Sequence, residues 1–124
     1  MAYNILLDNK KIGTSQLENA DPPMGVVFGT ITFSDTTFNF DFFSKYCTDN
    51  KIAAEIDHDD KIIVAAAIPS IKVFNDKGIE IIVEGCSISG MDSDVYDITI
   101  LGVPYPFYEE EFPHHIKAYE DKFK

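Results

Sequence analysis

The sequence predicts an α+β fold in which a mostly antiparallel, twisted β-sheet of six to eight strands is packed by a central helix and a C-terminal helix. Three observations predict it. Short segments of alternating apolar and polar residues are separated by turn-forming residues, and aromatic residues recur at helical spacing both mid-chain and near the C-terminus. The length of 124 residues fits one domain that spans residues 1–124.

The first strands are expected to form a hairpin followed by a central strand. Apolar residues alternate over Tyr3–Leu7, Asp8 and Asn9 supply the turn, and the chain returns over Lys11–Thr14. Residues 15–25 contain two consecutive prolines and predict a connector. Val26–Phe33 carries apolar residues on both faces, which predicts a central strand with cover on each side.

A helix is expected in the middle of the chain, over Thr37–Thr48. Ser34 or Asp35 is suited to cap its N-terminus, because short polar side chains accept hydrogen bonds from the first helical amides. One aromatic stripe at helical spacing should lie on the sheet. It consists of Phe38, Phe42, Phe43, Tyr46 and Cys47.

The pattern from Lys51 to Val103 is that of strands and turns, and a helix follows near the C-terminus. Gly85–Gly90 is expected to be a bulge or a loop. Pro104 and Pro106 end the strand pattern, and the terminal helix should begin at Pro113, since proline suits a first helical turn. The expected strands are Ile52–Asp57, Lys61–Ala67, Ile71–Phe74, Ile79–Glu84 and Val95–Val103.

The chain is strongly negative, and its charge is unevenly distributed. Its formal net charge is −11, with 21 acidic and 10 basic residues, and every basic residue is lysine. Residues 78–116 contain eight carboxylates and no lysine or arginine. Such a segment attracts basic proteins and repels nucleic acid and anionic membranes. We therefore expect a basic protein as the partner, and neither nucleic acid nor a membrane as a ligand.

The motifs that would indicate a metal, a cofactor or catalysis are incomplete. Asp92, Asp94 and Asp97 are spaced like the start of a calcium-binding loop, but the glutamate that ends such a loop is missing. His114 and His115 are adjacent, so on a helix they point in different directions and suit joint metal ligation poorly. We therefore expect no cofactor, no metal and no enzymatic activity.

The segment 105–112 combines aromatic and acidic residues between prolines. The prolines are expected to hold it extended, Tyr105 and Tyr108 to act as anchors in a partner, and the glutamates to meet cationic groups. The alternative is that these aromatic residues attach the terminal helix to the sheet. The expected partner-binding residues are Asp92, Asp94, Asp97, Tyr105, Tyr108, Glu109, Glu110 and Glu111.

In size, acidity and the combination of aromatic with acidic residues, the whole chain resembles the immunity proteins of bacterial toxin–immunity pairs. Those of contact-dependent growth-inhibition systems are one such group. The resemblance is one of overall character and carries over no family residue. It implies one-to-one binding that neutralises a cationic toxin domain, often a nuclease, by covering its active site.

Two other functions remain open at this stage. One is an enzyme or small-ligand-binding protein with a pocket near Cys86 and His114, and the other is a homo-oligomeric structural subunit. We expect a monomer, with a dimer as the alternative. The N-terminus has only a three-residue apolar run before a charge, so we expect no signal peptide, a cytoplasmic location, and reduced Cys47 and Cys86.

Overall fold

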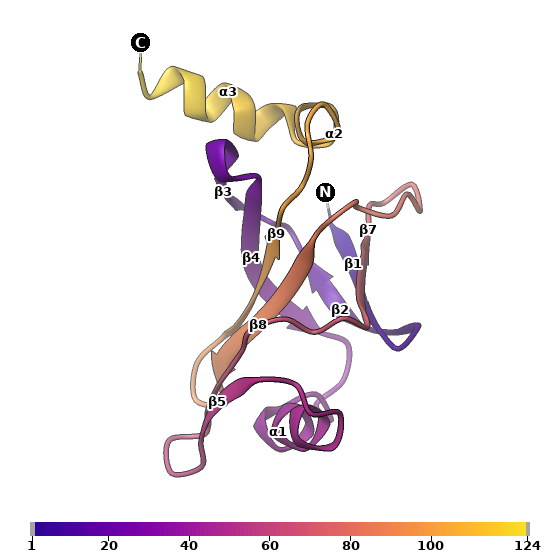
Figure 1. Cartoon of the computed structure of the whole chain (residues 1–124), viewed down its shortest axis with the longest axis vertical. Coiled ribbons are helices and arrows are strands. Elements are labelled where there is room, and N and C mark those ends of the chain that lie inside the picture. Colours follow the sequence, from indigo (N-terminus) through magenta and orange to yellow (C-terminus); the bar gives the residue numbers. More distant parts are fainter. Residues whose placement is uncertain (1, 124) are drawn as a thin grey trace.

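A computed structural model of the chain describes residues 2–123 and has the predicted α+β architecture. Its centre is a nine-stranded sheet in which all neighbouring strands run antiparallel (Figure 1). Eight strands follow the order β5-β6-β8-β9-β4-β2-β1-β7, and β3 pairs beside them with β4. The strands are β1 (Tyr3–Leu7), β2 (Lys10–Ser15), β3 (Asn19–Asp21), β4 (Val26–Phe33), β5 (Ala54–Asp57), β6 (Ile62–Ala65), β7 (Ile71–Phe74), β8 (Gly85–Met91) and β9 (Tyr96–Leu101).

The N-terminal hairpin is confirmed. Asp8 and Asn9 form its turn, and both have positive φ, at 51° and 67°. Two consecutive residues with positive φ match the twist of the flanking strands, and asparagine and aspartate tolerate that conformation better than most residues. The connector 15–25 is only partly confirmed, because it contains strand β3 and a short 3-10 helix, η1 (Pro22–Met24).

Strand β4 has the predicted bounds and is central in the sheet. It pairs with β9 along one side, and β2 and β3 share its other side. The prediction of cover on both faces is wrong. Val27, Gly29 and Ile31 are buried, whereas Phe28 and Thr32 on the opposite face are exposed.

The central helix, α1 (Phe40–Asp49), begins later than predicted. Its cap is Asn39, whose side chain accepts a hydrogen bond from the Phe42 amide at 3.0 Å. The expected cap Asp35 instead accepts bonds from Thr37 and forms a local turn before the helix. A short polar side chain ahead of a helix can accept hydrogen bonds either within a local turn or from the first helical amides. The sequence does not show which of these two contacts it makes.

The aromatic stripe of α1 lies on the sheet as predicted. Phe43 is 1% exposed and contacts Tyr96 of β9, with ring centroids 5.8 Å apart. Phe33 at the end of β4 contacts both rings. Figure 1 shows that α1 covers one end of the sheet, while the C-terminal helices lie at the other end.

Two predictions between β7 and β9 are wrong. Gly85–Met91 is a strand, β8, which pairs with β9 over six residues. Its small residues are suited to that position, because a Cβ added to Gly90 would lie 2.6 Å from Tyr96. In contrast, 79–84 is no strand: it forms an isolated bridge to β7 and buries Ile81 while leaving Ile82 exposed.

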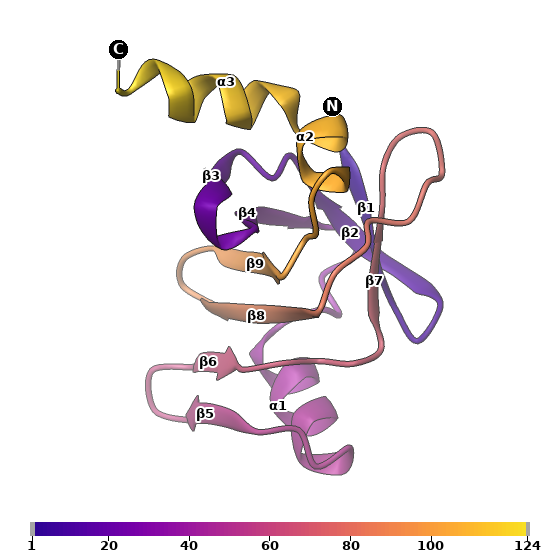
Figure 2. The ribbon, with the colours of Figure 1, turned by 45° about the horizontal axis from the view of Figure 1, so that its top comes forward.

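The C-terminal region forms two short helices, α2 (Phe107–Glu111) and α3 (Pro113–Asp121). The start of the terminal helix at Pro113 is confirmed. The expectation of an extended 105–112 segment is wrong, because Tyr105 and Pro106 form a turn with a cis peptide bond between them and Phe107–Glu111 is α2. Phe112 between the helices is fully buried and contacts Tyr3 and Tyr108, so the helices are attached to the sheet by aromatic packing. Figure 2 shows α2 beside the N-terminal end of β1.

Candidate functional site

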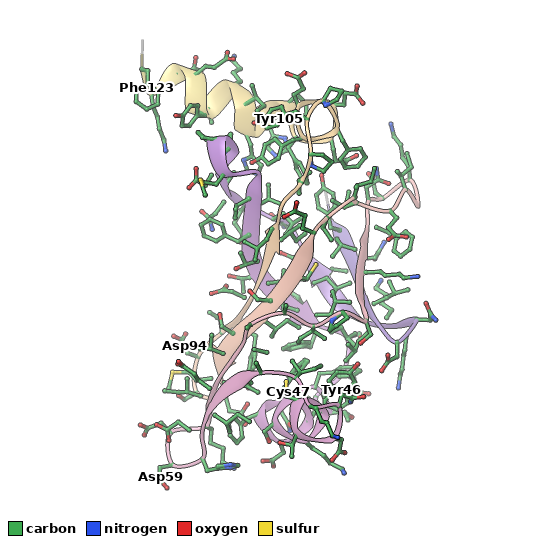
Figure 3. All side chains as sticks on the ribbon, viewed as in Figure 1. Tyr46, Cys47, Asp59, Asp94, Tyr105 and Phe123 are labelled. Atoms are coloured by element: carbon green, nitrogen blue, oxygen red, sulfur yellow. The ribbon has the colours of Figure 1, made fainter. Side chains whose placement is uncertain are left out.

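The predicted partner-binding residues lie at two ends of the molecule. Asp92, Asp94 and Asp97 belong to the β8–β9 hairpin, whereas Tyr105 and the three glutamates belong to the α2 region. Figure 3 shows Asp94 and Tyr105 near opposite ends of the molecule. These acids, which lie in one segment of the sequence, are therefore divided by the fold into two separate groups.

Three of the predicted acids make hydrogen bonds within the fold. Asp92 Oδ1 accepts from the Phe40 amide at 2.8 Å and from the Tyr96 hydroxyl at 2.8 Å. Asp92 thus joins the N-terminus of α1 to β9, where a negative charge also complements the helix dipole. Burial first, and then the Asp92 carboxylate, raise the pKa of Tyr96, which therefore stays protonated and donates.

The other two are Glu111 and Asp97. Glu111 accepts from the Tyr3 hydroxyl and from the Asn75 side chain, each at 3.0 Å, and so joins α2 to β1 and to the end of β7. Asp97 accepts from the Thr30 hydroxyl at 3.2 Å across the β4–β9 pair. These contacts give both carboxylates a structural role that the sequence did not predict.

The two tyrosines predicted as anchors differ in exposure. Tyr108 is 0% exposed, and its hydroxyl donates to the Val26 carbonyl at 2.9 Å. The prediction that Tyr108 is a surface anchor is wrong. Tyr108 instead follows the alternative, in which the aromatic residues of this segment attach the terminal helix to the sheet. Tyr105 is 50% exposed, stacks on Tyr108 at 5.3 Å between ring centroids, and donates to the Pro22 carbonyl at 2.9 Å.

A shallow groove, here called the C-terminal groove, lies between η1 and α3 beside Tyr105. Prolines, tyrosines and an isoleucine provide its apolar lining, and two glutamates add negative charge. The lining residues are Pro22, Pro23, Tyr105, Glu109, Ile116, Tyr119 and Glu120. Near it, Met24 is 69% exposed and Phe123 is 73% exposed, which makes them the two most exposed large apolar side chains among the described residues.

The position of η1 depends on Gly25. This residue has φ of 67°, and its amide donates to the Pro22 carbonyl, which ends the 3-10 turn. A Cβ at this position would lie 2.9 Å from the Val103 carbonyl oxygen. The Val103 amide in turn donates to the Gly25 carbonyl at 2.9 Å, which holds η1 beside the segment that carries Tyr105.

The hypothesis of a pocket shared by Cys86 and His114 is not supported by the geometry. His114 lines a shallow cavity with Tyr3, Gln16, Glu18 and His115, and Cys86 is not among its lining residues. Cys86 lies 3% exposed on β8, where burial raises the pKa of its thiol to about 12. A thiol with such a pKa is almost fully protonated at neutral pH and is a poor nucleophile.

The two histidines have local structural partners. His115 Nε2 lies 2.7 Å from the Leu17 carbonyl oxygen, a hydrogen bond that fastens α3 to the β2–β3 connector. The rings of His114 and His115 are 4.2 Å apart. Burial, and next the neighbouring His115, lower the pKa of His114, so both effects favour the uncharged form of the His114 ring.

The fold also brings together two acidic turns that are distant in sequence. The β5–β6 turn carries Asp59 and Asp60, and the β8–β9 turn carries Asp94. The two turns are neighbours because β6 pairs with β8. Figure 3 shows Asp59 and Asp94 at the same end of the molecule. The sequence missed this grouping, although the pairing of neighbouring hairpins would have indicated it.

Among the described residues, no group of three or more histidine, cysteine, aspartate or glutamate side chains is arranged to hold a metal ion. Over the same part of the chain, no helix has the length and apolar character needed to span a membrane. Comparisons with protein-family models, curated proteins and solved structures find no match to this chain. Any function must therefore be argued from the surface itself.

Proposed function

We propose that the chain is a protein-binding module whose C-terminal groove receives a basic partner protein. The observation that carries the proposal is the exposed, rigidly held ring of Tyr105 beside an apolar groove with two glutamates. Protein interfaces combine an apolar, aromatic centre with a polar rim, and tyrosine is enriched among the residues that dominate binding. The groove has this composition.

Tyr105 is suited to anchor a partner because little conformational freedom remains for it to lose. Its ring stacks on the buried Tyr108 and its hydroxyl is bonded to Pro22. The cost of ordering side chains on binding is one of the main opposing terms in association. An aromatic ring held in place before binding avoids much of that cost.

The charge of the groove favours a cationic partner. Glu109 and Glu120 line it, no lysine of the described residues does, and Glu110 is exposed next to Glu109. The net charge of −11 adds a long-range field of the same sign, which accelerates encounter with a basic protein. Asp92, Asp97 and Glu111 make hydrogen bonds within the fold. Of the acids expected to bind a partner, Glu109 and Glu110 therefore remain for contacts at the groove.

The most specific form of the proposal is an immunity protein that neutralises a toxin domain in the cytoplasm of a bacterium. The small size, the acidity and the exposed aromatic groove support it. Its direct test expresses the C-terminal domain of the protein encoded immediately upstream of this chain and measures cell growth with and without the chain. Restored growth together with a one-to-one complex would support neutralisation, and unrelieved toxicity without complex formation would refute it.

Variants of the groove test which surface is used. Tyr105→Ala is expected to weaken the complex by roughly thirtyfold or more, the loss typical of a central aromatic residue. The matched control is Val95→Ala, because Val95 is 49% exposed but lies in the β8–β9 turn at the other end of the molecule. Equal affinities for these two variants, with both folded by circular dichroism, would rule out the groove.

A charge variant tests the electrostatic part of the argument. Glu109→Lys is expected to slow association and to reduce its dependence on salt, whereas Glu80→Lys, outside the groove, should change both less. Association rates at low and physiological salt measure the effect. The electrostatic argument fails if the two substitutions have the same effect.

A further inference from the structure

Strand β5 leaves one side of the sheet unpaired. It stands at the end of the strand order, and within residues 2–123 it pairs only with β6. Figure 2 shows β5 below β6 as the lowest strand, with the C-terminal end of α1 and its connection to β5 reaching further down beside it. The opposite end of the sheet differs, because the Ile81 amide donates to the Val73 carbonyl at 2.8 Å and the 79–81 segment covers β7.

The register of the β5–β6 pair determines which backbone groups face outward. The Ala66 amide donates to the Ala53 carbonyl at 3.1 Å, which makes Ala53 and Ala66 a hydrogen-bonded pair. Hydrogen-bonded and non-bonded pairs alternate along antiparallel strands. Glu55 therefore bonds towards β6, and the backbone amides and carbonyls of Ala54 and Ile56 point to the open side.

The open edge is lined by acidic side chains. Glu55 and Asp57 lie on the strand, Asp59 and Asp60 lie in the following turn, and all four are exposed. One nearby cation, Lys61, is 3.6 Å from the Asp41 carboxylate and also lies over the Phe40 ring. An added strand with lysine or arginine would find complementary charge along this edge.

We propose that β5 accepts an extended, lysine- or arginine-bearing segment of a partner protein as an additional strand of the sheet. Backbone hydrogen bonds from Ala54 and Ile56 supply the pairing, and the carboxylates select a basic segment over other extended segments. A second copy of this chain is disfavoured, because two β5 strands side by side place like charges next to each other. This site lies at the end of the sheet away from the C-terminal groove and does not depend on it.

The test titrates the folded chain with a seven-residue probe peptide of alternating lysine and valine and, separately, with its glutamate–valine counterpart. Backbone amide NMR shifts report the site. The amides of Ala54 and Ile56 should shift with the lysine peptide, gain protection from hydrogen exchange, and respond little to the glutamate peptide. Shifts elsewhere, or equal binding of both peptides, would overturn the proposal.

Two variants separate backbone pairing from nonspecific charge attraction. Ile56→Pro removes an outward-pointing amide, and an edge strand tolerates proline at such a position. Ile56→Val is the matched control, because it retains the amide. Binding should weaken at least about tenfold in Ile56→Pro and remain unchanged in Ile56→Val. Glu55→Lys, which keeps the backbone intact, should also weaken binding of the lysine peptide. Unchanged binding of the lysine peptide to both Ile56→Pro and Glu55→Lys would refute strand addition. A dimer of the chain that forms without peptide and is abolished by Ile56→Pro would also refute the proposal, because the second copy would then occupy the β5 edge.

Discussion

Asp92 and Asp94 are two residues apart in the acidic segment, yet the structure predicts opposite consequences of removing them. Asp92 Oδ1 accepts hydrogen bonds from the Phe40 amide and the Tyr96 hydroxyl, both at 2.8 Å. Both residues are exposed in the β8–β9 turn, but within the described part of the chain the Asp94 side chain makes no hydrogen bond. Asp92→Ala should therefore destabilise the fold, and Asp94→Ala should not.

The magnitude follows from the two lost bonds. Loss of a side-chain acceptor at a helix N-terminus costs about 1 kcal/mol, and a part-buried tyrosine hydroxyl left without its acceptor costs about 1–2 kcal/mol. Asp92→Ala should lower the free energy of unfolding by about 2–3 kcal/mol, and Asp94→Ala should change it by less than about 0.5 kcal/mol. Asp92→Asn should fall between them, because both bonds go to one oxygen that asparagine retains without the charge.

Urea unfolding followed by circular dichroism measures these differences, with the slope of free energy against urea serving as a check that the unfolded states are comparable. Equal stabilities of Asp92→Ala and Asp94→Ala would refute the structural role of Asp92. The same result would count against the structural role of Glu111, because its contact with the Tyr3 hydroxyl is of the same kind.

Two further predictions concern the buried thiols and the C-terminal histidines. Cys47 and Cys86 are buried and burial raises the pKa of each thiol, so a thiol reagent at neutral pH should label both cysteines slowly in the folded chain and rapidly in urea, and fast labelling of the folded chain would contradict the packing. The pKa of His114 in the folded chain is lowered from its ordinary value of 6.5, so this histidine binds a proton more readily when the chain is unfolded. The free energy of unfolding should therefore not depend on His114 well above pH 6.5 and should decline as the pH falls below 6.5. In His114→Gln this part of the decline should be absent from urea unfolding measured over the same pH range, and an identical pH profile for the variant would contradict the assignment.

Much of the fold could be predicted from the sequence because its signals are local. The β1–β2 hairpin follows from two turn residues that accept positive φ, and β4 and the start of α3 follow from alternation and from Pro113. Each of these features depends on residues adjacent in the chain. The stripe of α1 was predictable for the same reason, although its cap was not.

The errors arise where distant contacts override local preference. Gly85–Gly90 has few strand-forming residues, but β9 on one side and β6 on the other supply its hydrogen bonds. Ile79–Glu84 has strong strand-forming residues, yet it makes a single bridge to β7. Strand preference depends largely on the packing neighbours that a segment finds, and these are not visible in its own sequence.

The sequence by itself determined the composition of the surface: a net charge of −11 carried by aspartate and glutamate, and an abundance of tyrosine and phenylalanine. Only the tertiary structure decided how those residues are used. It buries Tyr108 and leaves Tyr105 exposed, and of the two exposed carboxylates Asp92 and Asp94 it gives Asp92 the hydrogen bonds to Phe40 and Tyr96. The physical reason is that exposure and hydrogen bonding depend on which strands and helices meet, and residues close together in the chain can face opposite environments.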